Sequence, residues 1–236
     1  MALPKVALPT YELEIPSNGK KIKYRPFVVK EEKLLLLALE SGDDKQIEDA
    51  TRTLLKNCIT TRVKLEDLAI FDLEYIFLQI RAVSVGEVVE MLLTCEDDGE
   101  TQVKYNLNLT DVQVIKSEDH SSKIMLSDSM GLIMKYPSFE EFVKVSIIAK
   151  DTSEQVIEIM GKCVDQIFDG EDVYDSSTTS KKEFVEFIEG LTNKQFEKVQ
   201  EFFSEMPVLK HEIKLKNPNT GVENSFVIQG LSNFFG

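Results

Sequence analysis

Cysteine and histidine are scarce in this chain of 236 residues, which has three cysteines and two histidines. The cysteines, at positions 58, 95 and 163, are too few and too scattered for a disulfide framework. Cys58 and Cys163 each stand among apolar residues at helical spacing, so we expect both to be packed as free thiols. Neither His120 nor His211 stands in an arrangement like that of a known nucleophilic site. These features argue against a disulfide-stapled secreted protein and against nucleophilic catalysis.

Nucleotide-binding motifs and long apolar runs are missing as well. The sequence contains neither G-x-G-x-x-G nor a P-loop, so nothing in it supports nucleotide binding. Its longest apolar run, residues 34–39, falls far short of the ~18 residues that a membrane span needs. Pro4 and Pro9 interrupt the N-terminal stretch, which therefore lacks the apolar core of a signal peptide. We expect a cytosolic protein that is not an enzyme, carries no cofactor and crosses no membrane.

Charge is abundant but uneven, with a formal net charge of −14. Residues 1–33 hold seven basic and four acidic side chains, while the remainder holds 20 basic and 37 acidic ones. A body this acidic repels phosphate, so we expect no nucleic-acid partner. The basic N-terminal region could dock on an acidic protein, or it could simply form the solvated face of a hairpin.

Two related stretches organise the chain. Residues 92–109, LLTCEDDGETQVKYNLNL, are typical of a β-hairpin with an acidic turn at 96–99. Residues 213–231, IKLKNPNTGVENSFVIQGL, repeat that pattern, with Gly221 at the position of Gly99. Isolated two-stranded hairpins are marginal in water, so we expect these two to lie side by side. A third hairpin is predicted over residues 11–24, around the turn Ser17-Asn18-Gly19.

Helical patterns fill most of the remaining sequence. Helices are predicted over 28–41, from Asp43 or Asp44 to Cys58, and over about 65–83, followed by a stop at Gly86. Four more are predicted from the capping pairs Ser138/Glu141, Asp151/Glu154, Ser180/Glu183 and Thr192/Gln195. The second of these is expected to carry one apolar face from Val156 through Cys163 to Ile167. Residues 116–123 and 169–180 are interpreted as polar loops, and 124–134 as a short strand and a turn.

The turns of the two related hairpins invite a comparison with a zinc ribbon, in which each turn supplies C-x-x-C. Here the turns have the sequences Cys95-Glu96-Asp97-Asp98 and Asn217-Pro218-Asn219-Thr220. One thiolate of four is present; Asp98 could ligate, but asparagine and threonine are poor zinc ligands. We therefore expect a metal-free relic of that geometry, held by strand pairing and packing.

The sequence thus predicts an α+β fold, a helical block with three β-hairpins, of which the second and third pair in a degenerate, metal-free, zinc-ribbon-like arrangement. The expected divisions are an N-terminal arm and hairpin (1–27), a helical region (28–86), a paired-hairpin module (87–115 plus 208–236) and a helical insertion (116–207).

Three stretches together carry a resemblance to a known family. They are the first hairpin leading into KIKYRPFVVKEEKLLLLALES, the two degenerate turns, and the C-terminal part from FVEFIEGLTNKQFEKVQEFFSEMP to the end. In their order and spacing the chain resembles the baseplate hub and hub-assembly proteins of T4-like contractile-tailed bacteriophages, from about Pro4 to Phe235. The turns of that family often carry cysteine pairs, and this chain departs from the pattern at three of four positions.

The resemblance implies a structural or chaperone-like assembly component of the central hub of the baseplate, and no reaction. It implies other hub or tail proteins as partners, in homo- or hetero-oligomers, with assembly in the host cytoplasm and a place in the virion tail as a further expectation. One alternative is a cytosolic adaptor with a ribbon-like binding module, unrelated to phage tails. Another is a hydrolase with a carboxylate site that the sequence does not reveal.

Candidate partner-binding residues are found near both ends of the chain. Apolar, extended termini commonly bind the sheet edge or groove of a partner, although they can equally dock on the protein's own core. The candidates are Leu3, Pro4, Tyr24, Arg25, Phe27, Phe234 and Phe235.

Overall fold

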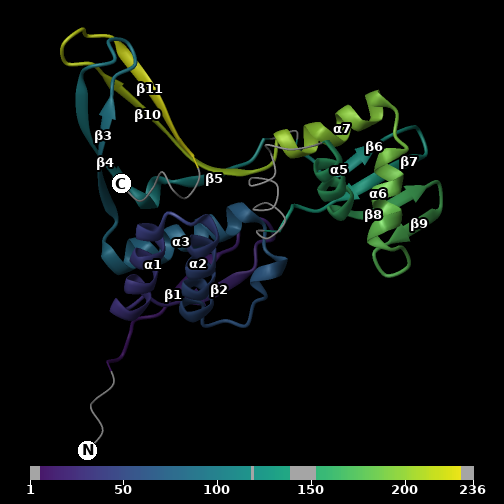
Figure 1. Ribbon diagram of the computed structural model, residues 1–236, viewed down its shortest axis with the longest axis horizontal. Coiled ribbons are helices and arrows are strands. Elements are labelled where there is room, and N and C mark those ends of the chain that lie inside the picture. The colour runs from purple at the N-terminus through teal and green to yellow at the C-terminus, as the bar shows by residue number, and fades with distance from the viewer. Residues whose placement is uncertain (1–5, 118–119, 139–152, 230–236) are drawn as a thin grey trace, which may run out of the picture. The chain divides into compact units, whose positions relative to one another are not determined.

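The computed structural model describes residues 6–117, 120–138 and 153–229 (Figure 1). The chain forms two compact units, one from Met1–Leu65, Phe71–Ile115 and Val208–Gly236, the other from Glu66–Ile70 and Lys116–Pro207. Helices occur together with several small antiparallel sheets, so the predicted α+β class is confirmed. The predicted helix after Ser138 and the capping pair Asp151/Glu154 fall wholly or partly outside the described residues.

The first unit begins with the predicted N-terminal hairpin, formed by β1 (Tyr11–Glu14) and β2 (Lys21–Tyr24). Gly19 has a φ of 69° in the connecting turn, a backbone conformation that glycine adopts without steric cost. Alternation along each strand buries Leu13 and Ile22, which are cross-strand partners. The period-2 pattern and the turn sequence therefore predicted this element correctly.

Three helices follow: α1 (Val29–Ser41), α2 (Asp44–Cys58) and α3 (Ile70–Val85). Gly42, with a φ of 64°, ends α1. The Asp43 carboxylate then accepts hydrogen bonds from the amides of Lys45 and Gln46 and so caps α2, as predicted. The helix expected from residue 65 is a short 3-10 turn, Leu65–Asp67, and then α3.

The two related hairpins complete the first unit. The strands β3 (Val88–Thr94) and β4 (Gln102–Asn108) form one, and β10 (Val208–Lys216) and β11 (Glu223–Gln229) form the other. A 3-10 turn, Leu109–Asp111, connects β4 to the short strand β5 (Gln113–Ile115), which pairs with β10 to give the sheet order β11-β10-β5. One buried cluster joins both hairpins to α3, and its members are Leu78, Ala82, Val89, Leu93, Leu107, Leu109, Val112, Leu209, Ile213 and Ile228.

The second unit combines a four-stranded antiparallel sheet with three described helices. Its strands are β6 (Lys123–Met125), β7 (Met130–Met134), β8 (Val164–Asp169) and β9 (Asp172–Asp175), in the order β6-β7-β8-β9. The helices are α5 (Ser153–Lys162), α6 (Lys181–Glu189) and α7 (Asn193–Ser204). Capping boxes at Ser180/Glu183 and Thr192/Gln195 begin α6 and α7 as predicted.

The expected helical face from Val156 to Ile167 is wrong in its second half, because α5 ends at Lys162 and a strand begins at Val164. The register of β7 with β8 shifts between Ile133, which pairs with Gln166, and Met134, which pairs with Val164. The extra residue in β8 is a β-bulge. Because of it, Val164 and Ile167, three residues apart, are both buried in the same core.

The interpretation of residues 169–180 as a loop is also wrong in part. Gly170, with a φ of 60°, lies in a tight turn that leads into β9, whose residues pair with β8 from Asp169↔Asp172 to Gln166↔Asp175. β9 has an aspartate at each end, and its sequence was therefore interpreted as a loop. Its two central residues, Val173 and Tyr174, are of the types that favour strands.

Candidate functional site

The turns of the two related hairpins have matching backbones. In each, the amide of the glycine donates to the carbonyl oxygen four residues earlier, from Gly99 to Cys95 and from Gly221 to Asn217, both at 2.9 Å. The two glycines have φ values of 70° and 77°. The internal repeat seen in the sequence is therefore a repeat of turn geometry, with Asn217 at the position of Cys95.

Side chains join the two turns across a separation of about 120 residues in sequence. The Nδ2 atom of Asn217 donates to Oδ1 of Asp97 and to Oδ2 of Asp98, each at 2.9 Å. The same side chain organises its own turn, since its Oδ1 accepts the amide of Asn219 at 2.8 Å. Asn217 is 1% exposed, so its amide bonds inside the structure rather than to water.

A second asparagine reinforces this contact from β11. Asn224 donates from Nδ2 to Oδ1 of Asp97 at 2.8 Å, and its Oδ1 accepts the backbone amide of Glu96 at 2.8 Å. The hydroxyl of Thr220 donates to Oδ2 of Asp97. We call Asp97, Asp98, Asn217, Thr220 and Asn224 the turn network. It places the two hairpins side by side, as the sequence repeat predicted.

Hydrogen bonds control the charges in the turn network. Donation from Asn217 and Thr220 lowers the pKa of Asp97 below its ordinary value. The hydroxyl and amide of Thr101, followed by Asn217, hold the pKa of Asp98 far below its usual range. Burial, followed by the nearby carboxylates of Asp97 and Asp98, raises the pKa of the Cys95 thiol. The carboxylates are therefore ionised at neutral pH, whereas Cys95 is kept as a thiol.

The side chains of the turn network differ from the ligands of a zinc ribbon, to which the two turns were compared in the sequence. Zinc binds thiolates and imidazoles, whereas the turn network joins carboxylates to amide and hydroxyl donors. In the described part of the chain, no group of three or more histidine, cysteine, aspartate or glutamate side chains is placed to hold a metal. The absence of zinc stays a prediction, and elemental analysis of the purified protein would test it.

We expect Asn217→Ala to destabilise the protein by about 2 kcal/mol, because the backbone amide of Asn219 loses its acceptor and the carboxylates of Asp97 and Asp98 lose a donor. Asp97 and Asp98 have lower pKa values in the folded state than in the unfolded chain, where a carboxyl titrates at about 4. Their ionised forms therefore stabilise the fold above pH ~4, and this stabilisation is lost as the pH falls below that value. The difference in unfolding midpoint between wild type and variant should therefore shrink from pH 7 to pH 2.5, as measured by circular dichroism.

Asn106→Ala is the matched control, because Asn106 is an exposed asparagine on β4. It should leave the midpoint unchanged at both pH values. An Asn217→Ala penalty that stayed constant across this pH range would show that the carboxylates do not contribute through their charge.

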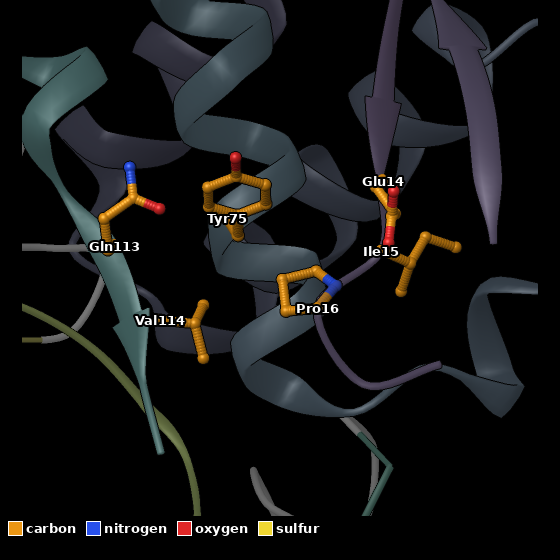
Figure 2. A pocket seen from close by; sticks show the side chains of 6 residues that line it. All are labelled: Glu14, Ile15, Pro16, Tyr75, Gln113 and Val114. Carbon is orange, nitrogen blue, oxygen red and sulfur yellow. The ribbon is translucent and has the colours of Figure 1, made fainter. Parts of the chain in front are cut away.

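A small pocket lies between β1, α3 and β5, with a volume of about 210 Å³ (Figure 2). Its lining residues are Glu14, Ile15, Pro16, Tyr75, Gln113 and Val114. The amide Nε2 of Gln113 donates to the carbonyl of Thr110 at 3.1 Å, and burial raises the pKa of Tyr75. Sequence reasoning missed this pocket, because its residues come from three segments that share no motif.

Two of the candidate partner-binding residues take part in the fold of the first unit. Tyr24 is 4% exposed, and its ring centroid lies 5.7 Å from that of Tyr11. Arg25 donates from Nη2 to Oε1 of Glu31 at 2.8 Å, with its side chain 21% exposed. Neither contact requires a second protein, and their role in binding a partner stays a prediction.

Of the other candidates, the structure describes only Phe27. Phe27 is half-buried, and its backbone amide donates to Oγ of Ser84 at 2.9 Å. Leu3, Pro4, Phe234 and Phe235 lie outside the described residues.

The outer face of α1 carries exposed apolar side chains that are not among the candidates predicted from the sequence. Val29 is 77% exposed, Leu36 52% and Leu37 54%. A signal was present, because four consecutive leucines turn through about 300° of a helix and cannot all face one core. We call Val29, Lys33, Leu36, Leu37 and Glu40 the α1 outer face.

The fold and these sites define the class of the protein: a two-unit α+β protein in which a polar hydrogen-bond network joins the turns of two β-hairpins. Among the described helices, none is long and apolar enough to cross a membrane. A family model described as T4 bacteriophage base plate protein matches residues 8–236, and the chain belongs to this family. Comparisons with curated proteins and with solved structures gave no significant match. The resemblance inferred from the sequence is confirmed, and the protein is a component of a bacteriophage baseplate.

Proposed function

We propose that this chain serves, without catalysing a reaction, as a structural or chaperone-like assembly component of the central hub of the baseplate. The observation that carries the proposal is the turn network, in which Asp97 and Asn217 bond to each other. Polar groups that satisfy their hydrogen bonds within the protein in this way fix a geometry rather than a reaction. The family match supports the baseplate, and the hub assignment rests on the resemblance in the residues.

The chain's surfaces favour protein partners. β11 is an outer strand of its three-stranded sheet, and no described strand pairs with its other edge. Such an edge can accept a strand from another protein by main-chain hydrogen bonding. Val227, on the solvent face of β11, is 55% exposed and would add apolar contact to such a pairing. A partner strand bound here would join the chain to another hub or tail protein.

The pocket gives little support to the hydrolase alternative. Acid–base hydrolysis generally needs two positioned groups, and Glu14 is the one carboxylate among the described residues that line the pocket. An adaptor unrelated to phage tails is disfavoured by the family match, which covers nearly the whole chain.

Deleting the gene from the phage should yield incomplete baseplates that lack a central hub, as seen by electron microscopy of infected-cell lysates. A plasmid copy of the wild-type gene should restore complete baseplates. Quantitative mass spectrometry of purified tails then separates the two forms of the proposal, since a structural part remains in the tail and an assembly factor does not. Complete hubs in the deletion strain would overturn both.

A Glu14→Gln copy should complement the deletion as well as the wild-type gene, because no reaction depends on that carboxylate. Failure of a folded Glu14→Gln protein to complement would instead assign a chemical or binding role to the pocket.

A further inference from the structure

The α1 outer face combines exposed aliphatic side chains with two exposed charges. Val29, Lys33, Leu36 and Glu40 succeed one another at spacings of four, three and four residues, which places them along one stripe of the helix. Leu37 lies beside the stripe and is 54% exposed. The buried side of α1 is formed by Glu31, Leu35 and Ala38, so the stripe faces away from the unit's own core.

Neither charge on this stripe is paired within the described chain. Lys33 and Glu40 are both exposed, and no salt bridge joins either to a described residue. Lys33 and Glu40 cannot pair with each other, because they are seven residues apart and their positions along the helix axis are therefore separated by about 10 Å.

The charges are placed symmetrically about the leucines. Lys33 lies three and a half residues before the midpoint between Leu36 and Leu37, and Glu40 lies three and a half residues after it. Opposite charges at equal distances from an apolar centre are what an antiparallel pair of identical helices requires.

We propose that the α1 outer face binds a second copy of this chain in a two-fold symmetric, antiparallel helix pair. Lys33 then meets Glu40 of the partner subunit, and the symmetry repeats the same contact in reverse. Leu36 and Leu37 form the apolar centre with their symmetry equivalents. A parallel pair would instead place lysine against lysine and glutamate against glutamate. An unrelated partner would need no such symmetry, and the pattern therefore favours self-association. This inference goes beyond the proposed function and does not depend on it.

A single helix pair is a small interface, so the dimer should form reversibly, with a Kd of roughly 1–100 µM. Sedimentation equilibrium of the purified full-length chain, over about 2–200 µM in low salt, measures it. Lys33→Glu should weaken dimerisation at least ~10-fold, because two glutamate pairs then face each other across the interface. Glu40→Lys should weaken it similarly through two lysine pairs.

The double variant Lys33→Glu/Glu40→Lys exchanges the two charges and should restore dimerisation to within ~3-fold of wild type. Lys182→Glu is the matched control, because Lys182 is an exposed lysine on α6; it should leave the equilibrium unchanged. Circular dichroism checks that every variant is folded.

A wild-type chain that stays monomeric up to 200 µM overturns the proposal, and so does a dimer that the single variants do not weaken. If both single variants weaken association but the double variant does not recover it, the antiparallel arrangement is wrong. Binding of the outer face to another baseplate protein, with no dimer of the purified chain, would assign the surface to that protein and refute self-pairing.

Discussion

Gly161→Ala should destabilise the second unit by about 3 kcal/mol, because α5 and α6 approach each other closely at this residue. A Cβ atom on Gly161 would lie 2.6 Å from Cγ2 of Val185 and 2.7 Å from its Cα. The Cα atom belongs to the backbone of α6 and cannot rotate away, so the two helices would have to move apart. Overpacking of this kind typically costs 1–3 kcal/mol and occasionally more. Urea unfolding followed by circular dichroism measures the change.

Gly190→Ala provides the matched control at the end of α6. A Cβ atom there would meet its nearest neighbours, the carbonyl oxygens of Glu186 and Phe187, at 3.5 Å. Its φ of −81° is open to any residue. Alanine should therefore be neutral or slightly stabilising, because it lowers the conformational entropy of the unfolded chain. Alanine favours a helix more than glycine does, so helix propensity alone would give no loss at either position. A loss at Gly190 as large as that at Gly161 would show that the close approach of α5 to α6 does not set the effect.

Local signals predicted those elements in which the local pattern and the final packing agree. Gly19 and Gly42 mark turns or helix ends where φ is positive, and Ser180 with Glu183 marks a helix start. Such features depend on the backbone within a few residues, and the sequence displays them directly. The α+β class and the three hairpins followed from them.

Nonlocal pairing explains what the sequence did not reveal. The bulge in β8 gave Val164 and Ile167 a helical spacing, and the shift in register is visible only against β7. Likewise, the hairpin repeat predicted that two turns would meet, but not that Asn217 would bond to two aspartates. Which atoms bond depends on how the turns approach each other in three dimensions. A single sequence does not contain that information in any local pattern.

Arg25 and Glu31 form a largely buried ion pair at the start of α1. Arg25 bonds to Oε1 of Glu31 at 2.8 Å, and the Glu31 side chain is only 8% exposed. The backbone amide of Val28 also donates to this carboxylate at 2.8 Å. Burial raises the pKa of Glu31, but the hydrogen bonds from Arg25 and Val28 outweigh it and lower the pKa overall. The carboxylate is therefore charged at neutral pH and depends on its cation.

Arg25→Ala should accordingly lower the free energy of unfolding by about 3 kcal/mol, since it leaves a buried carboxylate without its counterion. Lys23→Ala, which removes an exposed cation on the neighbouring strand, should have no measurable effect. The double variant Arg25→Met/Glu31→Met removes both charges and should regain part of the loss, because apolar side chains can replace a buried ion pair. It should not regain all of it, because methionine cannot accept the hydrogen bond from the Val28 amide. Urea unfolding at pH 7 measures all three. If Arg25→Ala unfolds like the wild type and yet fails to complement the gene deletion, Arg25 acts on a partner rather than in the fold.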